Sequence, residues 1–217
     1  MVHTESLRRE RLVRELVEKG IRDPRVLEAM GAVPRERFVQ EALRGEAYSG
    51  AALPIGAKQT ISQPFIVARM CELAAPAGGG KALEIGTGSG YHAAVLSHLF
   101  ELVYSIERLR ELAALALKTL RGLGIHNVHT KIFDGSYGWS EFAPFRAILV
   151  TAAAPDVPKP LLEQLEDGGR LILPIGDGEA DGEQVLTVVT RNGTKWKRTT
   201  HGPCRFVPLR GKYGWPV

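Results

Sequence analysis

The chain has 217 residues, of which 44% are apolar, and it carries 28 Lys and Arg against 24 Asp and Glu. This length allows one sizeable hydrophobic core and is too short for two full-size enzyme domains. No stretch approaches the roughly 18 consecutive apolar residues of a membrane span, and the N-terminal residues are too rich in charge for a signal peptide. We therefore expect a single-domain cytoplasmic protein without a membrane segment.

Cys71 and Cys204 are the only cysteines of the chain. Two thiols are too few for a disulfide framework, and neither has partners at metal-ligand spacing. The histidines are also poorly placed as ligands, since His126 and His129 would point to opposite faces of an expected strand. We expect reduced thiols and no metal site.

The net charge of +4 arises at the C-terminal end of the chain. From residue 191 onward there are seven basic residues and no acidic one, whereas the rest of the chain has 21 basic and 24 acidic residues. Because Trp196 and Trp215 do not form a stacking series, this stretch does not indicate a nucleic-acid interface. The seven basic residues are Arg191, Lys195, Lys197, Arg198, Arg205, Arg210 and Lys212.

The N-terminal part of the chain is expected to be helical and then irregular. Apolar residues at helical spacing predict a first helix, and Asp23 followed by Pro24 marks the N-cap of a second helix. Residues 48–62 are interrupted by glycine and proline and indicate an irregular segment, which precedes a helix over residues 65–73.

Strand-length and helix-length segments alternate after a glycine-rich linker at residues 75–80. This alternation predicts βαβ units with right-handed crossovers, and hence an α/β fold with a mostly parallel, Rossmann-like sheet. The Asn192-Gly193 pair predicts a closing antiparallel hairpin between residues 185–190 and 195–200. The other expected strands are 81–86, 102–106, 127–133, 147–151 and 170–175, and the expected helices are 91–100, 109–123 and 160–165.

Three alternate glycines, Gly86, Gly88 and Gly90, follow the first of these strands and precede a helix. Glycines at such a turn let the backbone approach a ligand, and the start of the helix presents free N–H groups. The spacing is G-x-G-x-G, whereas dinucleotide-binding proteins have G-x-G-x-x-G, and the difference favours a nucleoside ligand without a pyrophosphate. The surrounding residues fit neither a nucleophile elbow nor a P-loop.

Acidic residues follow the next two strands. Glu107 is placed where a carboxylate can accept hydrogen bonds from a ribose diol, and Asp134-Gly135 is suited to an adenine amino group. Taken alone, a glycine-rich turn is merely a tight βα connection about half the time, Glu107 would more often be a surface charge, and Asp134-Gly135 would be a turn. Because all three fall at the ends of consecutive strands, where open α/β sheets bind ligands, together they resemble the S-adenosylmethionine site of class I methyltransferases.

Further segments resemble the protein-L-isoaspartate O-methyltransferase family, and the resemblance covers about Asp23 to Leu209. The Thr60-Ile61-Ser62 segment and residues 206–209 are specific to this family, whereas the glycine motif is shared by methyltransferases at large. The resembling segments are Leu53-Pro54-Ile55-Gly56, Gln59-Thr60-Ile61-Ser62-Gln63-Pro64, Val150-Thr151-Ala152-Ala153-Ala154-Pro155, residues 169–176 and Arg205-Phe206-Val207-Pro208-Leu209.

The resemblance implies methyl transfer from S-adenosyl-L-methionine to the α-carboxylate of L-isoaspartyl residues in damaged proteins, with S-adenosyl-L-homocysteine as the second product. The ester would cyclise to a succinimide that can hydrolyse to normal aspartate. In the family, the serine corresponding to Ser62 is the active-site residue. The implied substrate-binding residues are Thr60, Ile61, Ser62, Val207, Pro208 and Leu209. The expected cofactor-binding residues are Thr60, Glu84, Gly86, Gly88, Ser89, Gly90, Glu107, Asp134 and Gly135.

The chain departs from the family pattern at two positions. Arg146 stands where the family commonly has an acidic residue, and we expect a surface change there. Ser136 stands where the family commonly has an aromatic residue. Because Ser136 lies beside the expected adenine-binding Asp134-Gly135, the family pattern does not define the details of that pocket.

Alternatives remain open for individual residues and for the function. Ser62 could cap a helix with Pro64 in its first turn, and residues 206–209 could form a final edge strand. The chain could methylate RNA or a small molecule, using its basic C-terminal stretch for phosphate. A noncatalytic nucleoside-binding module is a further alternative, and a nicotinamide dehydrogenase is opposed by the glycine spacing.

We expect one methyltransferase domain with three parts. These are an N-terminal helical and loop extension (1–78), a cofactor-binding α/β core (79–190) and a C-terminal hairpin with a substrate-cleft segment (191–217). The expected partners are isoaspartyl-containing proteins and peptides, with no nucleic acid or membrane partner, and the expected state is a monomer. Because an isoaspartyl site presents a free carboxylate, the basic C-terminal stretch could attract the substrate.

Overall fold

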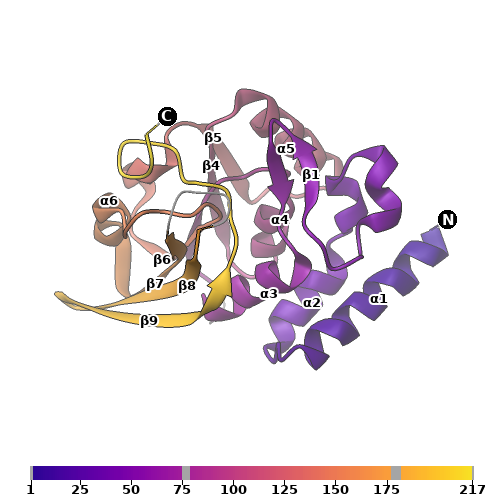
Figure 1. The fold of residues 1–217 in the computed structure, drawn as a ribbon, viewed down its shortest axis with the longest axis horizontal. Coiled ribbons are helices and arrows are strands. Elements are labelled where there is room, and N and C mark those ends of the chain that lie inside the picture. Colours follow the sequence, from indigo (N-terminus) through magenta and orange to yellow (C-terminus); the bar gives the residue numbers. More distant parts are fainter. Residues whose placement is uncertain (1, 75–78, 177–181, 217) are drawn as a thin grey trace.

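A seven-stranded sheet with the order β5-β4-β3-β6-β7-β8-β9 forms the centre of the computed structural model, which describes residues 2–74, 79–176 and 182–216 (Figure 1). Strands β5 to β7 in this order are parallel, whereas β8 and β9 are antiparallel to their neighbours. The strands are β3 (Lys81–Ile85), β4 (Leu102–Glu107), β5 (Val128–Ile132), β6 (Phe145–Val150), β7 (Leu165–Gly176), β8 (Gln184–Asn192) and β9 (Lys195–Cys204). The predicted Rossmann-like fold with a closing hairpin is confirmed.

Residues along the central strands alternate between two hydrophobic cores, one on each face of the sheet. On β3, Ala82 belongs to one core and Leu83 to the other, and Leu149 and Val150 of β6 divide in the same way. Strands that are buried on both faces carry nearly continuous apolar sequences, which explains the strand-length apolar runs. The alternation also decides where the polar residues of these strands point.

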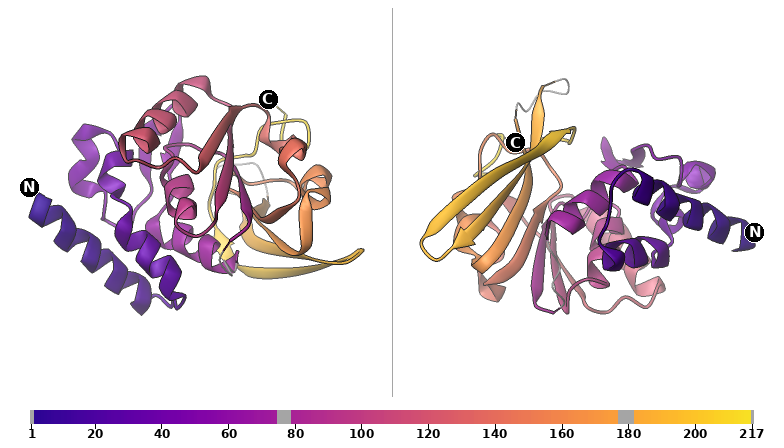
Figure 2. Two further views of the ribbon diagram at one scale, coloured as in Figure 1. Left: turned by 180° about the vertical axis from the view of Figure 1, so that it is seen from behind. Right: turned by 90° about the horizontal axis from the view of Figure 1, so that it is seen from below.

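Helices cover both faces of the sheet. The first core includes residues of the N-terminal helices and of α3 and α4, and the second includes Leu161 of α6. In Figure 2 the N-terminal helices lie on one side of the molecule, and the β8–β9 hairpin projects on the other. The helices are α1 (Val2–Glu18), α2 (Pro24–Ala32), α3 (Pro64–Leu73), α4 (Tyr91–Ser97), α5 (Arg110–Gly122) and α6 (Lys159–Glu163), and the short 3-10 turns are η1 (Arg35–Phe38), η2 (Glu41–Glu46), η3 (Gly135–Tyr137) and η4 (Ser140–Phe142).

The second helix begins as its sequence predicts. Asp23 Oδ1 accepts the backbone N–H of Arg25 at 3.0 Å, and Pro24 is the first residue of α2. This arrangement satisfies one of the free N–H groups of the helix N-terminus and confirms the predicted N-cap. Leu16 of α1 and Met30 of α2 are buried in the first core, so the N-terminal extension packs against the same face of the sheet as α4.

The prediction of an irregular segment over residues 48–62 is wrong for its second half, which forms an antiparallel hairpin. β1 (Leu53–Gly56) pairs with β2 (Gln59–Ile61) across a turn at Ala57 and Lys58. Both turn residues have positive φ, 48° and 57°, which is the geometry that Asn-Gly adopts in a type I′ turn. Because the turn lacks that pair of residues, the sequence pattern contained no indication of a hairpin.

Two alternatives considered for the family-specific segments are also wrong. The N-cap of α3 is Gln63, one residue after Ser62, and no side chain caps this helix. The outermost strand of the sheet is β9, and Pro208 forms only an isolated bridge with Ala153. Residues 75–78 of the predicted linker lie outside the described residues.

Candidate active site

A cleft of about 440 Å³ opens at the carboxyl ends of the parallel strands. It lies where the strand order reverses between β3 and β6, which is where open α/β sheets bind ligands, and its volume suits a small-molecule cofactor. Most of the predicted site residues line it. They are Thr60, Ile61, Ser62, Gly86, Gly88, Ser89, Glu107, Gly135, Val207, Pro208 and Leu209.

The glycine turn forms the floor of the cleft. Gly86 has a φ of +97°, and a Cβ there would lie 2.3 Å from Thr151 Oγ1. The Thr151 hydroxyl donates to the carbonyl oxygen of Gly86 at 2.8 Å, which joins the end of β6 to the turn after β3. Gly90 does not line the cleft; it has a φ of +88°, and a Cβ there would lie only 3.1 Å from Ala116 Cβ of α5.

Glu107 presents a fixed carboxylate to the cleft. Its Oε2 accepts the backbone N–H of Gly88 at 2.8 Å, and its Oε1 accepts that of Leu109 at 2.9 Å. Each carboxylate oxygen has a second acceptor site, so both can still receive a hydrogen bond from a ligand hydroxyl. The pair of oxygens at the end of β4 is therefore suited to a ribose diol.

Asp134 is not brought to the cleft; only its neighbour Gly135 lines it. Asp134 Oδ1 accepts from the N–H and the hydroxyl of Ser136 at 2.9 and 2.7 Å, and Oδ2 accepts from the N–H of Lys212 at 2.8 Å. The Ser136 hydroxyl in turn accepts from the N–H of Tyr213 at 3.0 Å. Ser136 thus helps Asp134 to anchor the C-terminal segment.

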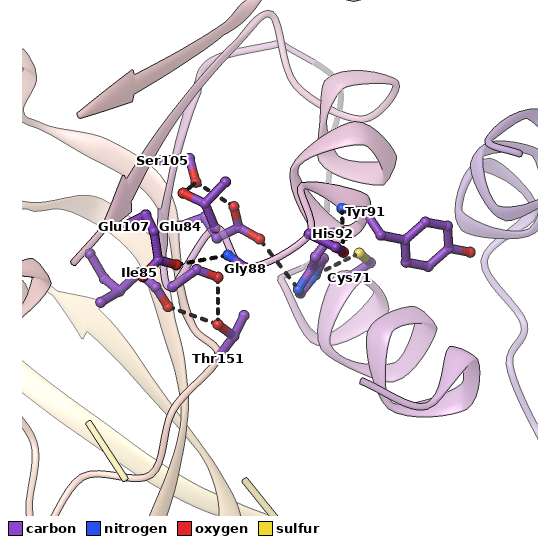
Figure 3. A network of polar contacts seen from close by, with 12 residues as sticks. Cys71, Glu84, Ile85, Gly88, Tyr91, His92, Ser105, Glu107 and Thr151 are labelled. Atoms are coloured by element: carbon purple, nitrogen blue, oxygen red, sulfur yellow. Dashed lines mark hydrogen bonds and ion pairs between the residues drawn. The ribbon is translucent and has the colours of Figure 1, made fainter. Parts of the chain in front are cut away.

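Glu84 also lies away from the cleft. It points into the first core because residues along β3 alternate between the two faces of the sheet. Its carboxylate is fully buried, accepts a hydrogen bond from Ser105, and has its Oε1 3.9 Å from Nδ1 of His92 (Figure 3). His92 Nε2 lies 3.3 Å from the free thiol of Cys71, which completes a buried polar chain beneath the cleft.

Burial shifts the pKa values of Glu84 and His92 in this buried polar chain in opposite directions. It raises the pKa of Glu84 to about 8 and lowers the pKa of His92 to about 4. Between about pH 6.5 and pH 8 an unfolded chain has released the Glu84 proton that the folded protein retains, so folding stability decreases as the pH rises. His92 has the opposite effect, but only below its ordinary pKa of 6.5.

We predict that the free energy of unfolding falls across this window by up to about 1.4 kcal/mol per pH unit, and that Glu84→Gln removes most of this slope. Urea unfolding of both proteins at a series of pH values measures the effect. Parallel profiles for the wild-type protein and Glu84→Gln would mean that Glu84 does not hold its proton in the folded state.

Several residues that line the cleft were not predicted. Thr151 follows β6 at the same edge of the sheet, so the rule that identified Glu107 could have identified it too. Arg108 directly follows Glu107, and Arg210 directly follows the predicted 207–209 segment. Lys58 lines the cleft from the tip of the β1–β2 hairpin, and no local pattern indicated it.

The described residues contain no group of three or more His, Cys, Asp or Glu side chains arranged to hold a metal ion. None of the described helices is both long and apolar enough to cross a membrane.

Comparisons with known proteins agree with this geometry. The model of the protein-L-isoaspartate(D-aspartate) O-methyltransferase family matches residues 7–214. A protein-L-isoaspartate O-methyltransferase of Geobacter metallireducens is 51% identical over 213 residues, which cover 97% of each chain. The corresponding protein of Syntrophotalea carbinolica is also 51% identical, over 96% of this chain and 95% of its own.

Solved structures give the same result. A protein-L-isoaspartate O-methyltransferase superposes with a TM-score of 0.86 and 31% identity, covering 95% of this chain and 67% of its own. A beta-aspartate methyltransferase of Plasmodium falciparum, in complex with S-adenosyl-L-homocysteine, has a TM-score of 0.77 and 25% identity, covering 93% of this chain and 98% of its own. The chain therefore belongs to the protein-L-isoaspartate(D-aspartate) O-methyltransferase family.

Proposed function

We propose that this protein transfers the methyl group of S-adenosyl-L-methionine to the α-carboxylate of L-isoaspartyl residues in damaged proteins and peptides. The ester then cyclises to a succinimide, whose hydrolysis can restore a normal aspartyl linkage. The observation that carries this proposal is that one cleft is lined both by the glycine turn and by the two segments specific to this family, Thr60-Ile61-Ser62 and Val207-Pro208-Leu209.

The side of the cleft formed by Glu107 and the glycine turn is suited to the cofactor. When bound, the cofactor supplies a methyl group on a positively charged sulfur. Glu107 offers two oriented acceptors for ribose hydroxyls. Gly86, Gly88 and Ser89 bring the backbone of the turn and the start of α4 against the ligand, and Gly135 lines the same cleft. The relative from P. falciparum that binds S-adenosyl-L-homocysteine supports this use of the cleft.

The part of the cleft that binds the substrate needs hydrogen-bond donors for a carboxylate but no strong base. A carboxylate is already ionised near neutral pH, so no proton has to be removed before its oxygen attacks the methyl carbon. The task of the protein is to align the oxygen, the methyl carbon and the leaving sulfur, which can lower a barrier by up to roughly 7–11 kcal/mol when the alignment is complete. Excluding water from the cleft should accelerate the reaction further, because the carboxylate anion and the sulfonium cation react to give neutral products.

Thr60 and Ser62 are the residues we assign to this alignment. Both line the cleft, and the Ser62 hydroxyl has no hydrogen-bond partner among the described residues, so it is available to the substrate carboxylate. Ile61 is buried between them and fixes the hairpin against the first core. We assign no covalent role to Ser62.

The basic C-terminal stretch divides into two groups. β8 runs antiparallel to β7, so the tip of the β8–β9 hairpin, with Lys195 and Lys197, lies at the edge of the sheet opposite the cleft (Figure 1). Arg210 instead lines the cleft. Within this stretch, we therefore expect attraction of an anionic substrate from Arg210 and not from the hairpin tip.

We predict that Arg210→Ala lowers kcat/KM for an isoaspartyl peptide by about two- to fivefold, as expected for an exposed charge worth about 0.5–1 kcal/mol. Lys197→Ala, at the hairpin tip, is the matched control and should leave kcat/KM unchanged. Raising the salt concentration should reduce kcat/KM more in the wild-type protein than in Arg210→Ala, which keeps the cleft-lining Lys58 and Arg108. Equal salt dependence in the three proteins would refute the role of Arg210.

The rival function, methylation of RNA or a small molecule, has less support. The basic residues of the hairpin tip lie far from the cleft, and Trp196 and Trp215 do not flank it. Mass spectrometry of the products separates the two functions. An isoaspartyl peptide should gain a methyl ester that decays to a succinimide, whereas stable methylation of added RNA, with no ester on the peptide, would favour the rival.

The remaining features proposed for the protein concern its organisation and surroundings. We propose a single domain with the three parts given above, because residues of the N-terminal extension and of the sheet share one core. We propose that the protein acts as a monomer. We also propose a cytoplasmic location and no nucleic acid or membrane partner; light scattering and cell fractionation test the monomer and the location.

A further inference from the structure

Arg35 is a fully buried arginine in the 3-10 turn η1, and it does not line the cleft. Arginine is almost never buried completely unless it is paired with an anion. Among the described residues, no carboxylate lies within ion-pair distance of Arg35. Its Nη1 is also buried without a hydrogen-bond partner. The protein therefore keeps an unpaired positive charge in its interior.

Backbone carbonyls hold the guanidinium in place. Nε donates to the carbonyl oxygen of Ala47 at 2.8 Å, and Nη2 donates to that of Ser62 at 2.8 Å and to that of Ala51 at 3.5 Å. Ala47 and Ala51 precede the β1–β2 hairpin, and Ser62 follows it. Arg35 thus ties the two ends of this hairpin together and fixes the backbone of Ser62.

The same guanidinium contacts the other side of the site through Tyr91. Its central carbon lies 4.8 Å from the centroid of the Tyr91 ring, an arrangement that favours the charged form. Tyr91 is the first residue of α4, directly after the glycine turn, and Figure 3 shows its ring pointing away from that turn. Arg35 therefore connects the base of the hairpin with the helix that begins at the cofactor side of the cleft.

We propose that Arg35 is a positioning residue for methyl transfer, which holds Ser62 in place and supplies the positive charge that favours an anionic substrate beside it. Carbonyl oxygens satisfy the N–H groups of the guanidinium but do not neutralise its charge. In the protein interior this charge acts on neighbouring groups more strongly than it would in water. A substrate carboxylate that binds at Ser62 supplies the negative charge that Arg35 lacks. The inference rests on the proposed function.

Two substitutions separate the charge of Arg35 from its hydrogen bonds. Arg35→Met removes both, and we expect KM for an isoaspartyl peptide to rise about tenfold. Binding of that peptide is compared with binding of its α-carboxamide analogue, in the presence of S-adenosyl-L-homocysteine, and the preference for the carboxylate should fall by a similar factor. Arg35→Lys keeps the charge but not the planar set of donors, so it should retain this preference while kcat falls about tenfold.

The matched control is Arg37→Met, on the exposed side of the same turn, which should behave as wild type. Wild-type KM and carboxylate preference in a folded Arg35→Met protein would overturn the proposal. So would equal weakening of both peptides, since that is the result of a merely structural role. If circular dichroism shows that Arg35→Met does not fold, wild-type kcat in Arg35→Lys overturns the positioning role. A wild-type protein that does not methylate the isoaspartyl peptide would instead contradict the proposed function.

Discussion

Glu107→Ala is expected to weaken the binding of S-adenosyl-L-homocysteine by roughly 100-fold or more. The substitution removes two charged acceptors for the ribose hydroxyls, and a hydrogen bond to a charged group contributes about 1.5–3 kcal/mol. It also frees the N–H groups of Gly88 and Leu109, which the carboxylate now holds at 2.8 and 2.9 Å. The glycine turn would then lose part of its shape in addition to its ligand contacts. Isothermal titration calorimetry measures the affinity directly.

Two further variants define this effect. Glu111→Ala changes an exposed carboxylate in the first turn of α5 and should leave the affinity unchanged. Glu107→Gln keeps the size of the side chain and one acceptor oxygen, so its affinity should lie between those of wild type and Glu107→Ala. An affinity of Glu107→Ala within about twofold of wild type, in a folded protein, would remove Glu107 from the cofactor site.

Ser62→Ala is expected to lower kcat for an isoaspartyl peptide by roughly 10- to 100-fold while the affinity for S-adenosyl-L-homocysteine stays close to wild type. The hydroxyl acts on the acceptor carboxylate and has no structural partner among the described residues. Loss of a single positioning contact has an effect of this order when alignment limits the reaction. Stopped-time methylation assays at saturating peptide give kcat.

The structure supplies a control for Ser62 as well. Ser49→Ala removes a hydroxyl from an exposed residue that does not line the cleft, and it should have wild-type kcat. Since no side chain caps α3, Ser62→Ala should also leave the thermal midpoint of unfolding nearly unchanged. A Ser62→Ala protein with wild-type turnover would show that the hydroxyl does not position the substrate.

The parts of the site that follow strands directly could be predicted from the sequence. Glu107 and the glycine turn lie at the carboxyl ends of β4 and β3, and the order of strands in an α/β sheet brings such ends together. Glu84 is only two residues from Gly86, but it lies inside β3, where side chains point alternately to the two faces of the sheet. Its side chain therefore points toward His92 of α4 and not into the cleft. Closeness in sequence to the motif therefore did not imply closeness to the cleft.

The contacts that could not be predicted join distant parts of the chain. Asp134 is 78 residues from Lys212, whose N–H it accepts, and Arg35 is 27 residues from Ser62, whose carbonyl oxygen it holds. Such contacts depend on the packing of whole elements and leave no local pattern. The β1–β2 hairpin was missed for a different reason, because Ala57 and Lys58 adopt positive φ without being the residue types that favour it.

The central claim is tested most directly by methyl transfer from labelled S-adenosyl-L-methionine to two peptides that differ only in an aspartyl or isoaspartyl linkage at one position. The account predicts base-labile label on the isoaspartyl peptide and none on the aspartyl peptide, with incorporation strongly reduced in Ser62→Ala and Glu107→Ala. Transfer to neither peptide by the folded wild-type protein, or equal transfer to both, would contradict it.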